Sequence, residues 1–502
     1  MEGSGCGLFV STWIRDALFA LVLVSVAWAI RSSLPSDLWK RSQPLTLRAT
    51  VDVVVEDRWI LPHTVDDRPL AKPPLINWLS APLVEAFGFS PWSHRVVPAL
   101  AAWLTCLFTL QLARMFHTND AVVLSAALLW VGTWLGFKSL LLVRPDPLLV
   151  LAGTSGLWAV VARLRGVRWS SGVLAGAIGL GLLAKGLAVL PLIGLAGAAP
   201  RLARIPRADW PSPPWWIIGV AAVPYLVWVL ATEVIRPGFP AEVLFGEEII
   251  GRMSGTGIEA AGRSPWQVVL GIWKLPVHFV LRTLPLSVFA LLAIRKMGRN
   301  DLAVLLVWFV VLHLVVFGFS ASRRADWMMP AVPAMAVLAA CRWCCHWRAP
   351  LGTSLAICAF VLSVVGWNEA RFGKRWIRPL ESFAQQARSR ILDRPAPVLM
   401  VGNDRNHLMG LLGLSGVDHH EPTSKAVLEE WLDGEVPPGE GFWVVAGDRL
   451  AFGTQPPQMP SAGMDSWNLL EGPVDWIFSV EAGDVEYMWP GALRLGWAQR
   501  RQ

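Results

Sequence analysis

The sequence predicts a polytopic α-helical membrane protein with a small C-terminal α/β domain. Of its 502 residues, 54% are hydrophobic and only 16% are charged, and the mean hydropathy is +0.47. An ordinary soluble domain contains about 25% charged residues. Apolar runs recur up to residue 365, whereas the later chain alternates strand-like runs with polar segments. We therefore expect about 11–13 spans in residues 1–369 and a separate domain in residues 370–502.

The positive charge is distributed as an orientation signal. The net charge is +7, and between the apolar runs the Lys and Arg residues gather in four islands, 163–168, 201–207, 295–299 and 342–348. These islands fall at alternate connections, which the positive-inside rule assigns to the cytoplasm. Short basic clusters of this kind do not indicate nucleic-acid binding, so the expected location is the lipid bilayer of the cell (inner) membrane. The rule places the C-terminal domain outside, together with the loops 31–95, 138–147, 233–266 and 320–327.

The membrane segments can be assigned in order from the apolar runs. Residues 17–30 lack a convincing cleavage site and are expected to form a retained first helix rather than a signal peptide. The later spans are expected at 96–112, 121–137, 148–161, 172–183, 187–198, 216–231, a run ending before Arg295, 302–319, a run after 327, and 351–365. Lys185-Gly186 should break the pair 172–183 and 187–198. Residues 45–55 and 75–87 are candidates for surface helices, since they are too short or too polar to span.

The C-terminal region reads as a small α/β fold. Strand-like runs occur at residues 397–402, 441–447 and 474–480. Residues 424–432 favour a helix that Ser424 can cap, although Val427 leaves the capping box incomplete. Hence we expect strands at these three places and one helix between them.

The first external loop contains the least membrane-like stretch of the apolar region, WILPHTVDDRPLAKPPLINWL from Trp59 to Leu79. Each proline removes a backbone donor, and a charge at bilayer depth costs several kcal/mol. The stretch therefore belongs at the membrane surface, between the first two apolar spans.

Five segments, taken in order, resemble one known family. They are Trp59-Ile-Leu-Pro62, Lys72-Pro-Pro-Leu75, Arg144-Pro-Asp146, Ala184-Lys-Gly186 and the run SRRADWMMPAVPAMAVLAA at 322–340. This order resembles the GT-C glycosyltransferases of the dolichyl-phosphate-mannose protein mannosyltransferase and aminoarabinose (lipid A) transferase type. The resemblance implies a GT-C-like membrane domain and a membrane glycosyltransferase of the cell envelope, either a hexosyl- or a pentosyltransferase. Such an enzyme moves a sugar, with inversion, from a polyprenyl-phosphate donor to a lipid, glycan or protein acceptor on the outer face.

Such a transfer needs cations to hold the leaving phosphate. Lys72 suits this role, because Pro73 and Pro74 stiffen the chain at the level of the lipid headgroups. Plain interfacial anchoring is the alternative explanation for each cation. The full set of candidate substrate-binding residues is Lys72, Arg95, Arg144, Lys185, Arg252, Arg323, Arg324 and Trp327.

Transfer also needs a carboxylate to take the acceptor proton. Counted back from Trp59, the family's acidic pair falls on Ser42 and Gln43, and serine cannot replace a carboxylate base. Asp37 is the first substitute, followed by Asp52, and Asp146 is a further candidate because it lies between two prolines at a span mouth. Another mechanism or a non-catalytic relative remains an alternative, as does a transport or lipid-binding protein that uses the same cations.

The sequence assigns no metal site or cofactor. Cys341-x-x-Cys344-Cys345-His346 has metal-like spacing, but it lies at a span end without a second pair of ligands, so a structural role is expected. The family resemblance leaves a divalent metal open. No P-loop or dinucleotide fingerprint is evident, which argues against ATP-driven transport.

Overall fold

The computed structural model describes residues 4–33, 43–63, 69–88, 91–209, 211, 214–251, 273–298, 301–318, 324–368, 386–401, 419–420, 441–447, 475–481 and 492–499. The chain divides into two compact units. The first comprises residues 1–33, 70–80 and 92–367, and the second comprises residues 34–69, 81–91 and 368–502. The domain division expected at residue 369 stays a prediction.

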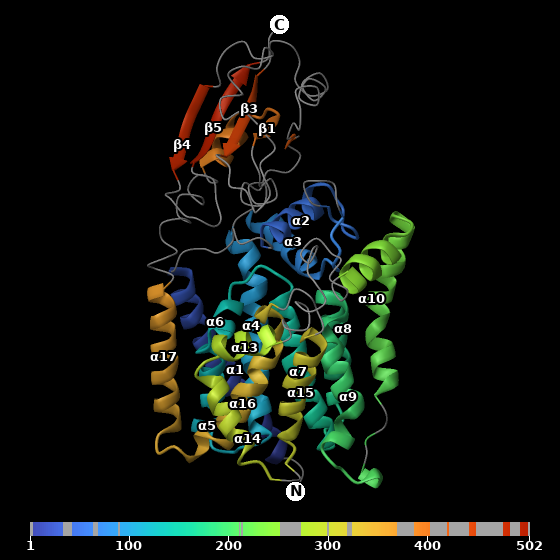
Figure 1. Ribbon diagram of the computed structural model, residues 1–502, viewed down its shortest axis with the longest axis vertical. Helices are drawn as coiled ribbons and strands as arrows, with labels where there is room; N and C mark the ends of the chain where they lie inside the picture. The colour runs from blue at the N-terminus through green and yellow to red at the C-terminus, as the bar shows by residue number, and fades with distance from the viewer. Residues whose placement is uncertain are drawn as a thin grey trace. The chain divides into compact units, whose positions relative to one another are not determined.

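The first unit is a helical bundle (Figure 1). Its longer helices are α1 (Ser4–Ser33), α4 (Pro91–Arg114), α5 (Asp120–Val131), α7 (Asp146–Leu164), α8 (Ser170–Lys185), α9 (Leu190–Leu202), α10 (Trp215–Ile235), α15 (Val304–Gly318), α16 (Val332–Arg342) and α17 (Pro350–Asn368). The shorter elements are α6 (Trp134–Ser139), η1 (Gly186–Val189), η2 (Arg207–Asp209), the π-helix η3 (Pro240–Gly251), α13 (Lys274–Arg282), α14 (Leu286–Ile294), η5 (Ala325–Ala331) and η6 (Cys344–His346). Helix α3 (Leu75–Phe87) begins in this unit and ends in the second.

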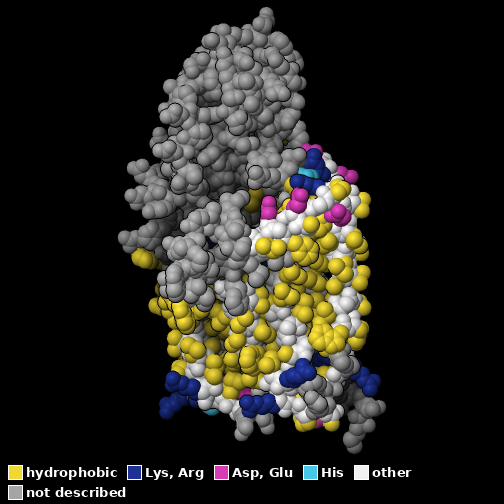
Figure 2. Space-filling view, turned by 45° about the vertical axis from the view of Figure 1, so that its right-hand side comes forward, with side chains coloured by type: hydrophobic (Ala, Val, Ile, Leu, Met, Phe, Trp, Pro, Cys, Tyr) yellow, Lys and Arg dark blue, Asp and Glu magenta, His cyan; other side chains and the backbone are white. Residues whose placement is uncertain are grey.

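The bundle has the length and apolarity of a multi-pass membrane domain. Among the described residues, seven helical stretches could cross a membrane, or eight if the bent pair α13 and α14 counts as one span. The expected 11–13 spans counted the shorter helices α5 and α15 and took α8 and α9 separately, whereas Ser170–Leu202 forms one apolar stretch of 33 residues. Figure 2 shows a broad apolar surface on this unit, with Lys and Arg gathered at its lower margin. These features confirm the predicted polytopic membrane protein.

One expected span is interrupted, and one expected break is confirmed. The span expected at 121–137 ends at Val131, because the Thr133 hydroxyl accepts a hydrogen bond of 3.0 Å from the Gly136 amide and caps the new helix α6. The break expected at Lys185-Gly186 is confirmed by the 3-10 turn η1. A Cβ on Gly181 would lie 2.5 Å from Val189 Cγ2, whereas a straight helix would separate these residues by about 12 Å. The chain therefore turns sharply after α8.

Helix α7 forms the centre of the bundle. It is buried from Asp146 to Ala162 and packs against α8, α9 and η5. Its 19 residues span about 28 Å, close to the thickness of the hydrocarbon core. Asp146 and Arg165 consequently lie at opposite ends of one membrane-length helix.

Two of the four basic islands meet at one end of the bundle, around the ring of Phe116. The guanidinium of Arg165 lies 5.8 Å from the ring centroid and that of Arg342 lies 5.7 Å from it. Arg342 also forms a two-point ion pair with Asp301, at 2.5 and 2.7 Å. Partial burial opposes ionisation of Asp301, but the hydrogen bonds from Arg342 hold its pKa below the ordinary value. This convergence agrees with the expectation that alternate basic connections share one side of the membrane.

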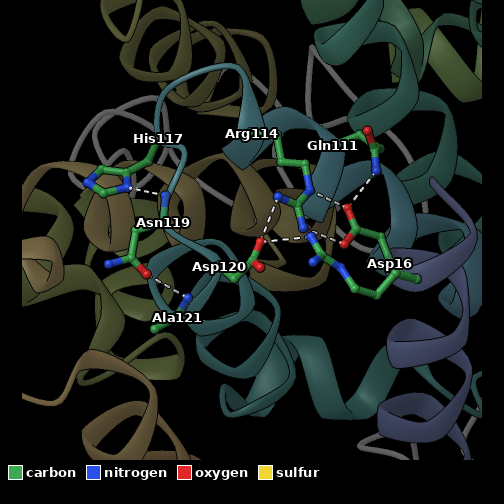
Figure 3. A network of polar contacts seen from close by, with 8 residues as sticks. Asp16, Gln111, Arg114, His117, Asn119, Asp120 and Ala121 are labelled. Carbon is green, nitrogen blue, oxygen red and sulfur yellow. Dashed lines mark hydrogen bonds and ion pairs between the residues drawn. The ribbon is translucent and has the colours of Figure 1, made fainter. Parts of the chain in front are cut away.

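The same end holds the ion network that fastens α1 (Figure 3). Asp16 on α1 is fully buried and accepts hydrogen bonds from Arg114 and Gln111 of α4, including one of 2.7 Å from Gln111 Nε2. Arg114 also donates to Asp120 of α5 at 2.9 Å, and the exposed Arg15 reaches the same carboxylate at 2.8 Å. The network therefore joins α1, α4 and α5.

The second unit contains helix α2 (Gln43–Val55) and a mixed sheet. Helix α2 falls on the helix expected at 45–55, but residues 46–53 are buried, so it is not exposed as a surface helix would be. The strands are β1 (Val398–Val401), β2 (His419–His420), β3 (Gly441–Gly447), β4 (Asp475–Glu481) and β5 (Ala492–Gln499), in the order β2-β1-β3-β5-β4. β1 pairs in parallel with β2 and β3, whereas β5 pairs antiparallel with β3 and β4.

Three of these strands agree with the sequence prediction. β1, β3 and β4 fall on the three expected runs, whereas β2 and β5 were not predicted. The helix expected at 424–432 lies outside the described residues. On the buried side of the sheet, the Trp443 indole donates to the carbonyl of Arg394 at 2.9 Å.

The Asp16 network makes a testable distinction between a buried and an exposed ion pair. Replacing Arg114 by Gln leaves the buried Asp16 carboxylate without its main counter-charge, which should cost about 3 kcal/mol of stability and lower the melting temperature in detergent. The matched control is Arg15→Gln, whose side chain is 55% exposed and whose loss should change stability by less than about 1 kcal/mol. Equal effects of the two substitutions would contradict the assignment.

Candidate functional site

At the end of α7 opposite Phe116, seven ionisable side chains form what we call the cation–carboxylate cluster. Its members are Lys72, Lys138, Arg144, Asp146, Lys185, Arg282 and Asp326. All seven belong to the first compact unit, but they come from segments far apart in the sequence. The cluster is therefore a product of the fold rather than of one local motif.

Asp146 is the first carboxylate of the cluster. Its Oδ1 lies 2.7 Å from the Lys185 ammonium, and its Oδ2 lies 3.0 Å from Nε of Arg144. The contact with Arg144 is an ion pair without a hydrogen bond, because the N–H of Arg144 is not directed at this oxygen as a hydrogen bond requires. The positive charge of Lys72 also acts on this carboxylate. With the residue only 2% exposed, these three cations compensate the cost of burying its charge.

Local sequence explains why Asp146 and Lys185 meet. Pro145 and Pro147 start helix α7, and Asp146 in its first turn is favoured by the helix dipole. Lys185 occupies the last turn of α8, where a cation is favoured, and Gly186 ends that helix with a φ of +58°. Packing of α7 against α8 then brings the start of one helix to the end of the other.

Asp326 is the second carboxylate, and it was not among the predicted site residues. Its Oδ2 lies 2.7 Å from the Lys138 ammonium and 3.4 Å from Nη1 of Arg144, while its Oδ1 lies 3.4 Å from Nη1 of Arg282. The signal available in the sequence was an acid within the run SRRADW, which the family resemblance had already singled out. In the structure, Lys138 pairs with Asp326.

Arg144 connects the two halves of the cluster, because it contacts both carboxylates. In total, five cations face two carboxylates, so the cluster carries surplus positive charge. Such a surplus in a partly buried place attracts an anion strongly, since the effective dielectric constant there is far below that of water. A phosphate, which can accept several charge-assisted hydrogen bonds, matches this arrangement.

The other predicted cations and Trp327 have different surroundings. Arg95 is buried on α4. Arg324 directly precedes η5, and Trp327 within η5 packs against Phe317 with ring centroids 5.6 Å apart. Both flank Asp326 in the chain. Arg252 and Arg323 lie outside the described residues.

Among the predicted acids besides Asp146, the structure describes Asp52. It belongs to the second unit and is fully buried on α2, where Arg48 and Arg58 approach its Oδ1 at 3.4 and 3.7 Å. The backbone amide of His63 donates to its Oδ2 at 2.8 Å. Burial lowers the pKa of Arg48, although the charge of Asp52 opposes this shift. Asp37 lies outside the described residues, as does Ser42.

The described residues contain no group of three or more His, Cys, Asp or Glu side chains that could hold a metal ion. Within the CxxCCH motif, Cys341 and Cys344 are buried at the end of α16 and in η6. The Cys341 thiol faces the carbonyl of Ala113 at 3.7 Å. These contacts are typical of cysteines that pack in a core.

A family model matches the part of the sequence that carries most of the cluster. The model for dolichyl-phosphate-mannose-protein mannosyltransferases matches residues 71–228. This segment carries Lys72, Lys138, Arg144, Asp146 and Lys185, which are five of the seven cluster residues.

Curated relatives extend the match. An undecaprenyl phosphate-alpha-4-amino-4-deoxy-L-arabinose arabinosyl transferase of Proteus mirabilis is 28% identical over 60% of this chain and 55% of its own length. One from Pseudomonas fluorescens is 26% identical over 66% of this chain and 58% of its own length. This chain thus spans little more than half the length of these relatives.

Solved structures show the fold. ArnT from Cupriavidus metallidurans, bound to undecaprenyl phosphate, superimposes with a TM-score of 0.62 at 15% identity and covers 97% of this chain and 98% of its own. The chain has the fold of ArnT. Mycobacterial AftD, an arabinofuranosyltransferase, matches with a TM-score of 0.52 at 14% identity, over 96% of this chain and 40% of its own. The GT-C-like fold and the resemblance to glycosyltransferases of the aminoarabinose transferase type are thereby confirmed.

The ArnT-like bundle holds its cluster together through ion pairs, and this can be tested without any substrate. Replacing Asp326 by Asn leaves Lys138, Arg144 and Arg282 to repel one another, which should cost about 2–4 kcal/mol of stability. Adding Lys138→Gln should recover part of this loss, because one of the repelling charges is then gone. Thermal unfolding of the two single variants and the double variant measures the coupling. Strictly additive losses would show that Lys138 and Asp326 do not interact.

Proposed function

We propose that this protein is a membrane glycosyltransferase that moves a sugar from a polyprenyl-phosphate donor to an acceptor. The observation that carries the proposal is the cation–carboxylate cluster, in which five cations exceed two carboxylates at one end of membrane-length helices. A polyprenyl phosphate presents its phosphate at such a level while its chain remains in lipid. The names of the curated relatives and the lipid bound to the solved ArnT support this class of donor.

In the proposed reaction, the bond between the anomeric carbon and the phosphate oxygen breaks while a bond to the acceptor oxygen forms. The electron pair of the broken bond goes to the phosphate, whose charge then grows. Lys72, Arg144 and Lys185 are placed to stabilise that charge, which is worth most where water is excluded. Attack from the opposite side inverts the anomeric centre, and the acceptor proton passes to a base.

The identity of the base rests on three candidate carboxylates, Asp37, Asp52 and Asp146. Both oxygens of Asp146 are contacted by cations, which favours a role in holding Arg144 and Lys185 for the phosphate. Asp52 is likewise held by Arg48 and Arg58. If the acceptor group is itself an anion, no base is needed, because no proton has to leave.

We further propose that the cluster faces the outer side of the bacterial inner membrane. The convergence of two basic islands around Phe116, at the opposite end of α7, supports this orientation through the positive-inside rule. The acceptor would then be a lipid, glycan or protein of the cell envelope.

Transfer is tested with purified protein, radiolabelled polyprenyl-phosphate sugars and a membrane extract as the source of acceptor. The label should move to an acceptor in a time-dependent way. Absence of transfer with every donor, in a preparation shown to be folded and to bind polyprenyl phosphate, would favour the alternative of a lipid-binding protein without chemistry.

The phosphate role of Lys72 predicts a specific loss. Lys72→Gln should weaken donor binding and lower the rate of transfer by at least about tenfold, because a charge-assisted contact to the phosphate disappears. The matched control is Lys296→Gln, which removes an exposed lysine stacked 4.6 Å from Trp343 at the end of α16 where the basic islands meet. Comparable losses in both variants would contradict a specific role for Lys72.

The base is tested by replacing Asp37, Asp52 and Asp146 one at a time with Asn. Loss of turnover with retained donor binding is the result expected of a base, whereas loss of both is expected of a carboxylate that holds the cations. Unchanged turnover in all three variants would remove these carboxylates as bases.

A further inference from the structure

Helix α13 carries a row of polar and cationic side chains that ends at Arg282 of the cluster and otherwise lies outside it. Lys274, His278 and Arg282 follow one another at intervals of four residues, so they lie along one side of the helix. All three are exposed, and the Arg282 side chain is 46% exposed although it contacts Asp326. We call these three residues the α13 stripe.

The stripe lies between two apolar faces of different character. On one side, Leu275 and Phe279 are buried, at 0% and 3% exposure, where α13 packs against the bundle. On the other side, Val277 and Leu281 are 51% and 59% exposed, as lipid-facing side chains are. The stripe therefore follows the boundary between protein and lipid, which is where the headgroup of an adjoining lipid meets the protein.

The orientation of α13 suits this place. Helix α14 packs against α16, which belongs to the membrane-length stretch Ala325–His346, and α13 turns away from α14 by 107°. A helix bent so strongly from its neighbour runs across the direction of that neighbour. Basic residues along such an amphipathic helix attract anionic lipid headgroups.

The stripe is continuous with the cation–carboxylate cluster. Its last member, Arg282, lies 3.4 Å from Asp326, which also holds Lys138 and Arg144. A phosphate moving along the boundary from Lys274 toward Arg282 would thus reach the cluster without leaving a cationic surface. A row of cations that served only to anchor the protein at the membrane surface would not need to end at the cluster.

From this arrangement we infer that the α13 stripe is a docking surface for the phosphate headgroup of a polyprenyl-phosphate lipid, and that it guides this headgroup sideways from the bilayer into the cluster. The inference rests on the proposed function, since it names a route to the same site. It assigns a role to Lys274 and His278, which lie outside the cluster.

The test measures binding of sugar-free undecaprenyl phosphate to the full-length protein in nanodiscs of neutral phosphatidylcholine. The double variant Lys274→Gln/His278→Gln should bind it about five- to tenfold more weakly than the wild type, with a smaller dependence on salt. The matched control, Arg295→Gln/Lys296→Gln, removes two exposed cations after the end of α14 and should change the affinity less than twofold. Circular dichroism and the melting temperature establish that both variants are folded.

Three results would overturn the inference. One is unchanged binding by the α13 double variant while Lys72→Gln abolishes binding, which leaves the proposed function standing. Another is an equal loss in the control, or equal affinity of the wild type for phosphatidylglycerol, since either indicates general attraction of acidic lipids. The third is failure of the folded wild type to bind undecaprenyl phosphate, which would remove the proposed function as well.

Discussion

The structure of the functional end depends on one constraint, namely that several cations must be kept close together in a place with little water. Like charges at such distances repel one another by several kcal/mol when the dielectric constant is low. Asp146 and Asp326 make the arrangement tolerable, because each neutralises part of the charge of its neighbours. The pairing costs desolvation on both sides, so it is better understood as a device for positioning than as a source of stability.

The helices that hold this cluster extend to the opposite end of the bundle. Helix α7 begins at Asp146 and reaches the cap residue Arg165, and η5 with α16 runs from the neighbourhood of Asp326 to Arg342. Arg165 and Arg342 then both lie close to the ring of Phe116. These two helical stretches therefore connect the candidate phosphate-binding cluster with the basic connections at the other end of the bundle. The buried Asp16 network attaches α1 at the end where the basic connections lie.

Much of this architecture could be predicted from the sequence, because apolar runs and basic islands report directly on spans and connections. Lys72, Arg144, Asp146 and Lys185 could be identified from short motifs rich in proline and glycine, whose backbone restrictions are visible locally. Asp326 and Arg282 were missed, since their importance arises from contacts between helices distant in the chain. The early end of α5 was also missed, because Thr133 acts through a capping hydrogen bond that hydropathy does not reveal.

Arg144 contacts both carboxylates, and this sharing has a consequence for how an anion would be received. In the resting protein, Asp146 and Asp326 already occupy positions around the cations that a phosphate would seek. An arriving phosphate would therefore enter by partner exchange, taking over contacts that already exist instead of meeting bare charges. Because Arg144 contacts both carboxylates, a change of partner at one carboxylate would alter the contacts of the other. The two sides of the cluster would therefore respond to a ligand as a single unit.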